Sequence, residues 1–193
     1  DVGYLHISSF TESTKSEVQK ALKEFKSSTE SGGLIIDLRN NPGGLLTSVV
    51  DVASLFLDKG MVLYEINGSH ARKDWKVKPN WGQQDYPIVV IINEFSASAS
   101  EVLCGALMDH DRATVIGTTS FGKGSVNILR SLSDGSGIYF SIAHWFTPDG
   151  TLIEGSGIEP DVIVDLPKDF LAVVVDCTEV VLAVRVVVLG EAV

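Results

Sequence analysis

The sequence predicts an α/β fold whose central sheet is mainly parallel and is flanked by helices. Short runs of Val, Ile and Leu alternate along the chain with segments in which apolar residues recur at helical spacing. Such short apolar runs are typical of strands that are buried on both faces of a parallel sheet. The alternation of strands and helices favours crossover connections between parallel neighbours. We expect one domain over residues 1–169 and a Val-rich tail over residues 170–193.

The first half of the chain carries signals for three strands and two helices. Thr14 and Glu17 form the Thr-x-x-Glu pattern of a capping box, and apolar residues follow at helical spacing. An Asn-Asn-Pro-Gly-Gly turn precedes the second helix. The stretch 69–86 is polar and has no clear period, so we expect a long exposed excursion there. The predicted strands are 2–8, 34–38 and 61–66, and the predicted helices are 14–28 and 45–57.

The second half continues the alternation and ends in two strands that pair with each other. A Ser-Asp-Gly-Ser-Gly turn at 133–137 separates the last two apolar runs, as in a hairpin. The predicted strands are 88–92, 114–117, 126–132 and 137–146, and the predicted helix is 98–109. The Val-rich tail matches no pattern, and an edge strand, an interface segment and an artefact all stay open.

Charge and composition exclude several classes of function. The chain carries 15 Lys and Arg against 25 Asp and Glu, a formal net charge of −10, and has no dense basic cluster. We therefore expect no nucleic-acid partner. Cys104 and Cys177 form no Cys-x-x-Cys pair, and no His-Glu-x-x-His spacing occurs. We expect neither a metal nor another cofactor, and we expect Cys104 to be a buried small hydrophobe.

No transmembrane segment is predicted. The longest apolar stretch, 171–189, is interrupted by Asp176, Glu179 and Arg185, which a spanning helix does not tolerate. The chain begins at Asp1 rather than at a methionine, so we expect a processed product or an excised fragment. The oligomeric state stays open.

The Ser-Ala-Ser-Ala-Ser segment at 96–100 follows an apolar strand and precedes a helix. A serine at such a junction lies beside unpaired backbone N–H groups, which favour a developing negative charge. That environment suits a nucleophile whose attack creates an oxyanion. The alternative is structural: small residues let the helix pack closely, and a serine caps it. Taken alone, the segment favours this alternative.

Residues 117–123 match the Gly-x-x-x-x-Gly-Lys pattern of a phosphate-binding loop, but Gly124 stands where such a loop needs Ser or Thr. The residues that follow have strand-like rather than helical character, which disfavours nucleotide binding. Lys123 lies between two glycines, so the backbone can approach a site closely. A buried lysine has a lowered pKa and acts as a base near neutral pH. The alternative is a solvated lysine in a turn.

The Asn-Pro-Gly-Gly loop at 41–44 leads from a predicted strand into a predicted helix. Its glycines permit backbone geometries that direct N–H groups into a cavity, and the Gly44 N–H is a candidate oxyanion donor. The alternative is a tight turn without further role.

The histidines provide no better candidate for a general base. None lies in a Gly-x-Ser-x-Gly motif, and no Asp partner stands out for any of them. The four are His6, His70, His110 and His144.

Together these segments resemble the catalytic core of the C-terminal processing peptidases, also called tail-specific proteases. The resemblance covers about residues 1–167 and implies a ClpP/crotonase-like α/β peptidase core. It rests on short motifs in a shared order and spacing: Asp-Leu-Arg-Asn-Asn-Pro-Gly-Gly at 37–44, Ser-Ala-Ser-Ala-Ser-Glu at 96–101 with Ala106 and Asp109, Phe-Gly-Lys-Gly at 121–124, Thr-Pro-Asp-Gly at 147–150, and Gly-Ser-Gly-Ile-Glu-Pro-Asp at 155–161.

The resemblance implies a Ser-Lys dyad. It assigns the nucleophile to Ser98, the general base to Lys123, the oxyanion hole to the N–H groups of Gly44 and Ala99, and supporting positions to Asp109 and Asn127. The family commonly has Gln where this chain has Asn127, whose amide is one methylene shorter. The family also carries a PDZ domain, and no such domain is recognisable in these residues.

The implied function is that of a serine endopeptidase that cleaves proteins near their C-terminal tails through an acyl-enzyme. The implied partner is a protein or peptide substrate, and the implied setting is extracytoplasmic: periplasm, cell envelope or thylakoid lumen. Two alternatives remain. One is a non-catalytic binding module on the same fold, and the other is the disfavoured nucleotide-binding protein.

Overall fold

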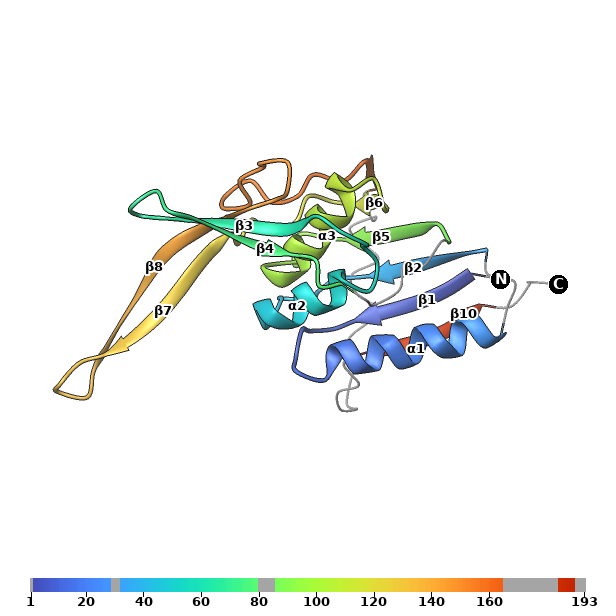
Figure 1. The fold of residues 1–193 in the computed structure, drawn as a ribbon, viewed down its shortest axis with the longest axis horizontal. Helices are drawn as coiled ribbons and strands as arrows, with labels where there is room; N and C mark the ends of the chain where they lie inside the picture. The colour runs from blue at the N-terminus through green and yellow to red at the C-terminus, as the bar shows by residue number, and fades with distance from the viewer. Residues whose placement is uncertain (1, 29–31, 80–85, 165–183, 190–193) are drawn as a thin grey trace, which may run out of the picture.

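A computed structural model describes residues 2–28, 32–79, 86–164 and 184–189, and these residues form two sheets and three helices (Figure 1). The strands are β1 (Val2–Ile7), β2 (Gly33–Asp37), β3 (Met61–Asn67), β4 (Arg72–Lys76), β5 (Ile88–Ile92), β6 (Thr114–Gly117), β7 (Ser125–Ser131), β8 (Gly137–Phe146), β9 (Val162–Ile163) and β10 (Val184–Leu189). The helices are α1 (Thr14–Ser28), α2 (Leu46–Ala53) and α3 (Ala99–Asp109).

The larger sheet has six strands in the order β10-β1-β2-β5-β6-β9. All neighbours are parallel except β10, which runs antiparallel to β1. The prediction of an α/β fold with a mainly parallel central sheet is therefore confirmed. β10 belongs to the segment 170–193 and forms one edge of this sheet, which is the first of the three possibilities left open for the tail.

The helices follow the predicted positions, with two local differences. α1 covers the predicted residues, but the hydroxyl of Thr14 does not cap it: Thr14 is buried, accepts from the Thr11 N–H at 2.8 Å and donates to the Ser9 carbonyl at 3.2 Å. α2 ends at Ala53 rather than near residue 57. The chain then continues through turns whose backbone bonds span three residues, such as that from Leu55 to the Val52 carbonyl.

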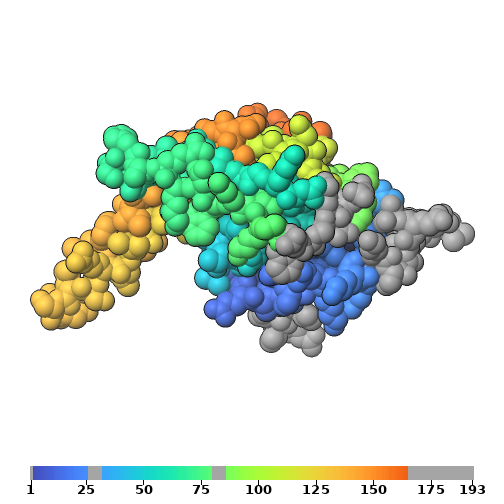
Figure 2. All heavy atoms as spheres, in the orientation of Figure 1, coloured from blue at the N-terminus to red at the C-terminus, as the bar shows by residue number. Residues whose placement is uncertain are grey.

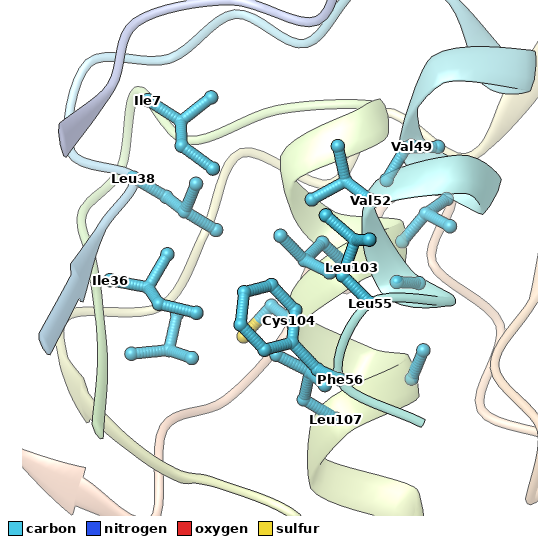
Figure 3. Packing of buried hydrophobic residues seen from close by; sticks show 14 of the residues in the cluster. Ile7, Ile36, Leu38, Val49, Val52, Leu55, Phe56, Leu103, Cys104 and Leu107 are labelled. Atoms are coloured by element: carbon cyan, nitrogen blue, oxygen red, sulfur yellow. The ribbon is translucent and has the colours of Figure 1, made fainter. Parts of the chain in front are cut away.

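The core lies where the larger sheet meets α2 and α3 (Figure 3). Ile36 and Leu38 come from β2 and the residue just after it, and they face Val52 and Leu103 of the two helices. Each such side chain contributes about 1.5–3 kcal/mol when fully buried. Cys104 is fully buried in the same cluster, as predicted, and its burial raises the pKa of the thiol.

The smaller sheet is antiparallel, in the order β4-β3-β8-β7, and was predicted only in part. β4 lies inside the stretch 69–86, so the long excursion expected there contains a strand that was not predicted, although four of its five residues are exposed as expected. Four of its five residues are charged, so it lacks the apolar pattern of a strand. Contacts with residues that are distant in sequence hold it to β3. Lys73 forms an ion pair with Glu65 at 3.1 Å, and its ammonium lies over the ring of Trp75.

The parallel arrangement decides where the functional loops lie. The carboxyl ends of β2, β5 and β6 meet at one edge of the larger sheet, so the loops that follow them come together there. These are the three loops that the sequence motifs single out. Among the described residues, no helix is long and apolar enough to cross a membrane.

Candidate active site

The three serines of the segment after β5 have different environments. Ser96 donates its hydroxyl to the Leu38 carbonyl at 2.8 Å, and Ser100 donates to the Asn41 carbonyl at 3.0 Å. Both are fully buried and tie this segment to the loop after β2. Ser98 makes no such bond to that loop within the described residues, and 7% of its surface is exposed. Of the three hydroxyls in this segment, that of Ser98 is the one not donated to the loop after β2.

The backbone of Ser98 is strained. Its φ of 57° and ψ of −114° lie outside the regions that a serine ordinarily occupies, and such a conformation costs about 1–3 kcal/mol. The residue stands between β5 and α3, where its carbonyl accepts from the Val102 N–H at 3.0 Å. A sharp turn from a strand into a helix is the arrangement by which hydrolases present a nucleophile.

The carboxylate of Glu101, in the first turn of α3, is fully buried between the loops after β5 and β6. Its Oε2 atom accepts from the backbone N–H groups of Ser98, at 2.7 Å, and Lys123, at 2.9 Å. Its Oε1 atom accepts from the Gly122 N–H at 2.6 Å and from the Ser120 hydroxyl at 2.7 Å. One oxygen atom therefore joins the backbones of the two candidate catalytic residues.

The side chains of this pair are not joined in the same way. Lys123 is exposed, and no hydrogen bond links its amine to the Ser98 hydroxyl among the described residues. The expectation of a buried lysine is thus wrong for this structure. Its neighbour Phe121 is 63% exposed, so the outer side of the loop is open to solvent. The loop binds the buried Glu101 through the Ser120 hydroxyl and the backbone N–H groups of Gly122 and Lys123, so the Lys123 side chain is left on its outer side.

Glycines let this loop approach its neighbours closely. A Cβ on Gly124 would lie 2.3 Å from the Glu154 backbone nitrogen, and the Gly124 N–H donates to the Glu154 carboxylate at 2.8 Å. Gly122 has a φ of 86° and accepts from the Gly155 N–H at 2.9 Å. Lys123 is therefore held from both sides, as the position between two glycines predicts.

The loop after β2 lies directly against the nucleophile candidate. Gly43 has a φ of 104°, and a Cβ built on it would lie 2.7 Å from the Cβ of Ser98 and 2.9 Å from the Ala99 nitrogen. No other residue can occupy this position without displacing the serine. The Gly43 N–H is itself fixed by the side-chain oxygen of Asn41 at 2.8 Å.

Two backbone N–H groups of the candidate site, those of Gly44 and Ala99, have no acceptor among the described residues. The Phe10 N–H donates to the Gly43 carbonyl and the Leu45 N–H donates to the Phe10 carbonyl, and this bridge includes no bond from the N–H of Gly44. Ala99 is the first residue of α3, so its N–H has no partner within the helix. Two unpaired donors close to a nucleophile can stabilise an oxyanion.

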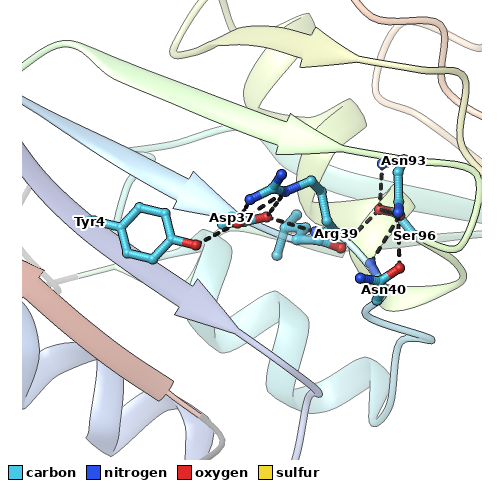
Figure 4. A network of polar contacts seen from close by, with 7 residues as sticks. Tyr4, Asp37, Arg39, Asn40, Asn93 and Ser96 are labelled. Carbon is cyan, nitrogen blue, oxygen red and sulfur yellow. Dashed lines mark hydrogen bonds and ion pairs between the residues drawn. The ribbon is translucent and has the colours of Figure 1, made fainter. Parts of the chain in front are cut away.

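A polar network at the end of β2 fixes the loop that carries Gly44 (Figure 4). The carboxylate of Asp37 accepts from the Tyr4 hydroxyl at 2.5 Å and from Arg39 at 2.6 Å. Burial alone would raise the pKa of Asp37, but the hydrogen bonds from Arg39 and Tyr4 lower it below its ordinary value. Asp37 is 2% exposed, so this ion pair sits at the border of the core.

A second set of contacts joins the loops after β2 and β5. Asn93 donates from its side-chain amide to Asn40 at 2.9 Å, and its carbonyl oxygen accepts from the Asn40 backbone at 2.9 Å. The Ser96 hydroxyl accepts from the Asn93 N–H at 3.0 Å (Figure 4). The two loops that carry the candidate oxyanion donors are therefore locked to each other.

The two supporting positions do not reach the candidate pair. The side-chain amide of Asn127 donates to the Ser125 hydroxyl at 3.1 Å and accepts from the Ser141 hydroxyl at 2.6 Å, with no bond to Lys123. Asp109 lies in the last turn of α3 and accepts from the Asp149 N–H at 2.8 Å. Asp109 therefore holds a distant turn rather than the site.

A pocket of about 820 Å³ opens beside the loop after β2. It is lined by residues of two segments, 9–13 and 42–45, and Gly43 and Gly44 form part of its wall. A substrate side chain can enter there next to the candidate oxyanion donors. No cluster of three or more His, Cys, Asp or Glu suitable for a metal ion is present in the part of the chain that the structure describes.

Sequence reasoning assigned no role to Glu101 or Gly43. A signal for Glu101 was present, because Ser98 and Glu101 form the same Ser/Thr-x-x-Glu pattern that was recognised at the start of α1. Gly43 belongs to the quoted Asn-Pro-Gly-Gly loop, but only the structure reveals how close it lies to Ser98.

Comparisons with known proteins agree with this arrangement. The family model described as Peptidase family S41 matches residues 1–164. The carboxy-terminal-processing protease of Bartonella bacilliformis is 43% identical over 175 residues, which are 86% of this chain and 39% of that protein. The carboxyl-terminal-processing protease of Synechocystis sp. is 41% identical over 168 residues, covering 86% of this chain and 38% of that protein.

Solved structures give the same result. The photosystem II D1 C-terminal processing protease has a TM-score of 0.80 at 36% identity, covering 85% of this chain and 42% of that one. The tricorn protease, at 21% identity and a TM-score of 0.54, shares the fold. The chain spans about two-fifths of the length of the curated relatives described above.

The predicted resemblance to C-terminal processing peptidases is confirmed by these relatives, whose identity to the chain extends over most of its length. From the match over residues 1–164 together with this identity, it follows that the chain belongs to peptidase family S41.

Proposed function

We propose that this chain is the proteolytic core of a serine endopeptidase that cleaves proteins near their C-termini, with Ser98 as nucleophile and Lys123 as general base. The observation that carries the proposal is the shared hydrogen bonding of both backbone N–H groups to Glu101 Oε2. The contact with Ser98 completes the capping box of α3, and the contact with Lys123 ties the loop after β6 to the same buried oxygen atom.

In the proposed mechanism, the neutral amine of Lys123 takes the proton of the Ser98 hydroxyl while Oγ bonds to the substrate carbonyl carbon. The N–H groups of Gly44 and Ala99 bind the resulting oxyanion, and loss of one such donor costs about 3 kcal/mol. Collapse of the intermediate breaks the C–N bond, and Lys123 gives its proton to the leaving amine. Water then attacks the acyl-enzyme, with Lys123 taking and returning a proton.

Because Lys123 is exposed, its amine reaches Ser98 in this mechanism by rotation of the lysine side chain. The backbone does not have to move, since Glu101 already holds both residues. The Asn127 amide is engaged by its own strand pair, so we assign it no part in orienting the amine.

We further propose a protein or peptide substrate that presents a C-terminal tail, and an extracytoplasmic setting. The names of the relatives, among them a protease that processes photosystem II D1 at its C-terminus, support the tail. The setting rests on the resemblance to the family. The pocket beside Gly43 and Gly44 supports a substrate side chain at the scissile bond.

One observation favours a second candidate, a binding module without hydrolysis. The exposed Lys123 side chain has no hydrogen bond to Ser98 within the described residues. A module of this kind would bind peptide in the same cleft but would leave the serine unreactive.

Covalent labelling separates the two candidates. A fluorophosphonate probe should label the wild-type protein at Ser98, and Ser98→Ala should abolish both labelling and cleavage of an unfolded protein that carries an apolar C-terminal tail. Ser16→Ala, an exposed serine on α1, is the matched control and should behave as wild type. A wild-type protein that binds the tailed substrate but resists the probe is a binding module.

A further inference from the structure

The hairpin formed by β7 and β8 projects from the body of the protein as an arm (Figure 2). Every residue from 128 to 142 is exposed, and we call this segment the distal hairpin. An exposed surface this rich in large apolar side chains is typical of a site that binds a partner. Those side chains are between 38% and 68% exposed: Ile128, Leu129, Leu132, Ile138, Tyr139, Phe140 and Ile142.

The strand register places apolar side chains on both faces of the distal hairpin. Ile128 lies opposite Phe140, and Leu129 lies opposite Tyr139. Because neighbouring residues of a strand point to opposite faces, these two pairs occupy different faces. An isolated ribbon of two strands is marginally stable in water at best. A partner that covers either face of this hairpin would bury apolar side chains there.

The outer edge of β7 has no strand partner among the described residues. The opposite edge of the same sheet, β4, carries four charged residues among its five, a composition that blocks pairing with another strand. β7 carries a single charge, Arg130, among seven residues and contains no proline. One edge is therefore protected, while the other is left able to accept a strand.

The open edge starts at the candidate active site. β7 begins at Ser125, two residues after Lys123, and the intervening Gly124 is bonded to Glu154. From there the strand runs outward along the arm (Figure 1). A chain that pairs with β7 has one end beside the candidate dyad.

We propose that β7 receives an extended, apolar segment of the protein substrate as an added strand. This inference rests on the proposed function, since it assigns a partner to the same site. Backbone hydrogen bonds along the edge provide affinity that does not depend on sequence, while alternate side chains meet the apolar faces. The seven residues of β7 span about 23 Å, so a substrate segment of about seven residues is held in line with Ser98.

Binding is tested in the Ser98→Ala background, where cleavage cannot interfere. The probe is a fluorescein-labelled, twelve-residue unstructured peptide in which Val alternates with Ser, and its affinity is measured by fluorescence anisotropy. Leu129→Lys should weaken binding on the order of tenfold, because an apolar contact of about one leucine is lost. Ile163→Lys is the matched control: Ile163 is 64% exposed on β9, in the other sheet, and its substitution should change nothing.

A second measurement needs no protein variant. Replacing single backbone amides of the peptide by esters removes one N–H donor at a time. Addition to β7 predicts weaker binding at every second position, because alternate N–H groups of an added strand face the edge. Equal effects at all positions, or none, overturn strand addition.

The remaining outcomes separate this proposal from its rivals. If the wild-type protein resists the fluorophosphonate probe but binds the peptide with the alternating pattern, the proposed catalysis is wrong and strand addition stands. If the protein reacts with the probe but Leu129→Lys binds the peptide as tightly as the unsubstituted protein, only the proposal of strand addition is wrong. A dimer in sedimentation that Leu129→Lys converts to monomer, with unchanged peptide affinity, assigns the arm to a second copy instead.

Discussion

Glu101 is the residue on which the geometry of the candidate site depends. A carboxylate has about four acceptor positions, and those of Glu101 are all used by neighbouring donors. Two of these donors are the backbones of Ser98 and Lys123, and a third is Gly122. Because the carboxylate is fully buried, water cannot replace any of these bonds if one is lost.

Glu101→Gln is therefore expected to inactivate the protein without removing much volume. The amide nitrogen cannot accept, so two buried donors lose their partner at a cost of about 1–3 kcal/mol each. Fluorophosphonate labelling of Ser98 should slow by at least about a hundredfold, and the urea midpoint should fall. Glu159→Gln, at an exposed position, is the control and should change neither quantity. Normal labelling of Glu101→Gln would show that the carboxylate does not align the pair.

Gly43 offers a test of how tightly the oxyanion loop packs against the nucleophile. In Gly43→Ala the new methyl would lie 2.7 Å from the Cβ of Ser98, and the backbone would keep a φ of 104° that alanine rarely adopts. We expect a large fall in kcat for a peptide substrate and only a small fall in the free energy of unfolding. Gly68→Ala is the matched control, because no atom lies within 4 Å of its Cβ position. Equal losses of kcat in both variants would contradict this packing argument.

At the residue scale, the sequence indicated which residues belong to the candidate site but not how exposed or hydrogen-bonded they are. The family resemblance distinguished Ser98 from Ser96 and Ser100, and the structure adds a physical reason, because the hydroxyls of Ser96 and Ser100 are donated to the loop after β2. The exposure of Lys123 could not be predicted, because it depends on which backbone atoms of the loop face the interior.

At the scale of elements, the end of β2 carries an ion pair between Asp37 and Arg39. Asp37 is held by Arg39 and by Tyr4, which comes from the neighbouring strand β1. The contact fixes the direction in which the chain leaves the sheet toward Gly44. Its strength depends on the charge of Asp37, and that makes it sensitive to pH.

The pKa of Asp37 is lowered from its ordinary value of 3.8, so folding favours the charged form. The resulting stability is fully present above pH 3.8 and is lost as the pH falls through the still lower pKa of the folded protein. Asp37→Asn should lower the free energy of unfolding at pH 7 by about 1–3 kcal/mol. In urea titrations, the difference from wild type should shrink progressively below pH 3.8. Asp149→Asn, an exposed position, should show no such dependence. A difference that stays constant with pH would mean that the charge of Asp37 does not matter.

The elements that the sequence predicted share one property: their patterns are local. The buried parallel strands and α1 carry their apolar spacing within a few residues, and all were placed within a residue or two. β4 was missed because its stability comes from long-range partners on β3, such as Glu65 for Lys73. α2 was placed too long because Leu55, Phe56 and Leu57 are buried in turns, where apolar content continues without the helix.

At the scale of the whole molecule, two sheets have separate tasks. The six-stranded sheet brings the three loops together and provides much of the core, while the β7–β8 hairpin of the four-stranded sheet extends from the site as an arm. The inner part of the arm belongs to the core, since Trp145 and Ala143 of β8 are buried. The distal hairpin has no buried residue at all, so the core should not depend on it.

This division predicts that the distal hairpin can be removed without unfolding the protein. Asn127 and Ser141 face each other across the two strands, so an Asn-Gly turn placed directly between them closes the shortened ribbon. The urea midpoint should stay close to that of wild type, because no buried apolar surface is lost. Binding of the alternating Val-Ser peptide should fall by more than tenfold, because most of the edge of β7 is gone. A shortened protein that unfolds at much lower urea would assign the arm to the core, whereas one that keeps full peptide affinity would place the substrate elsewhere on the molecule.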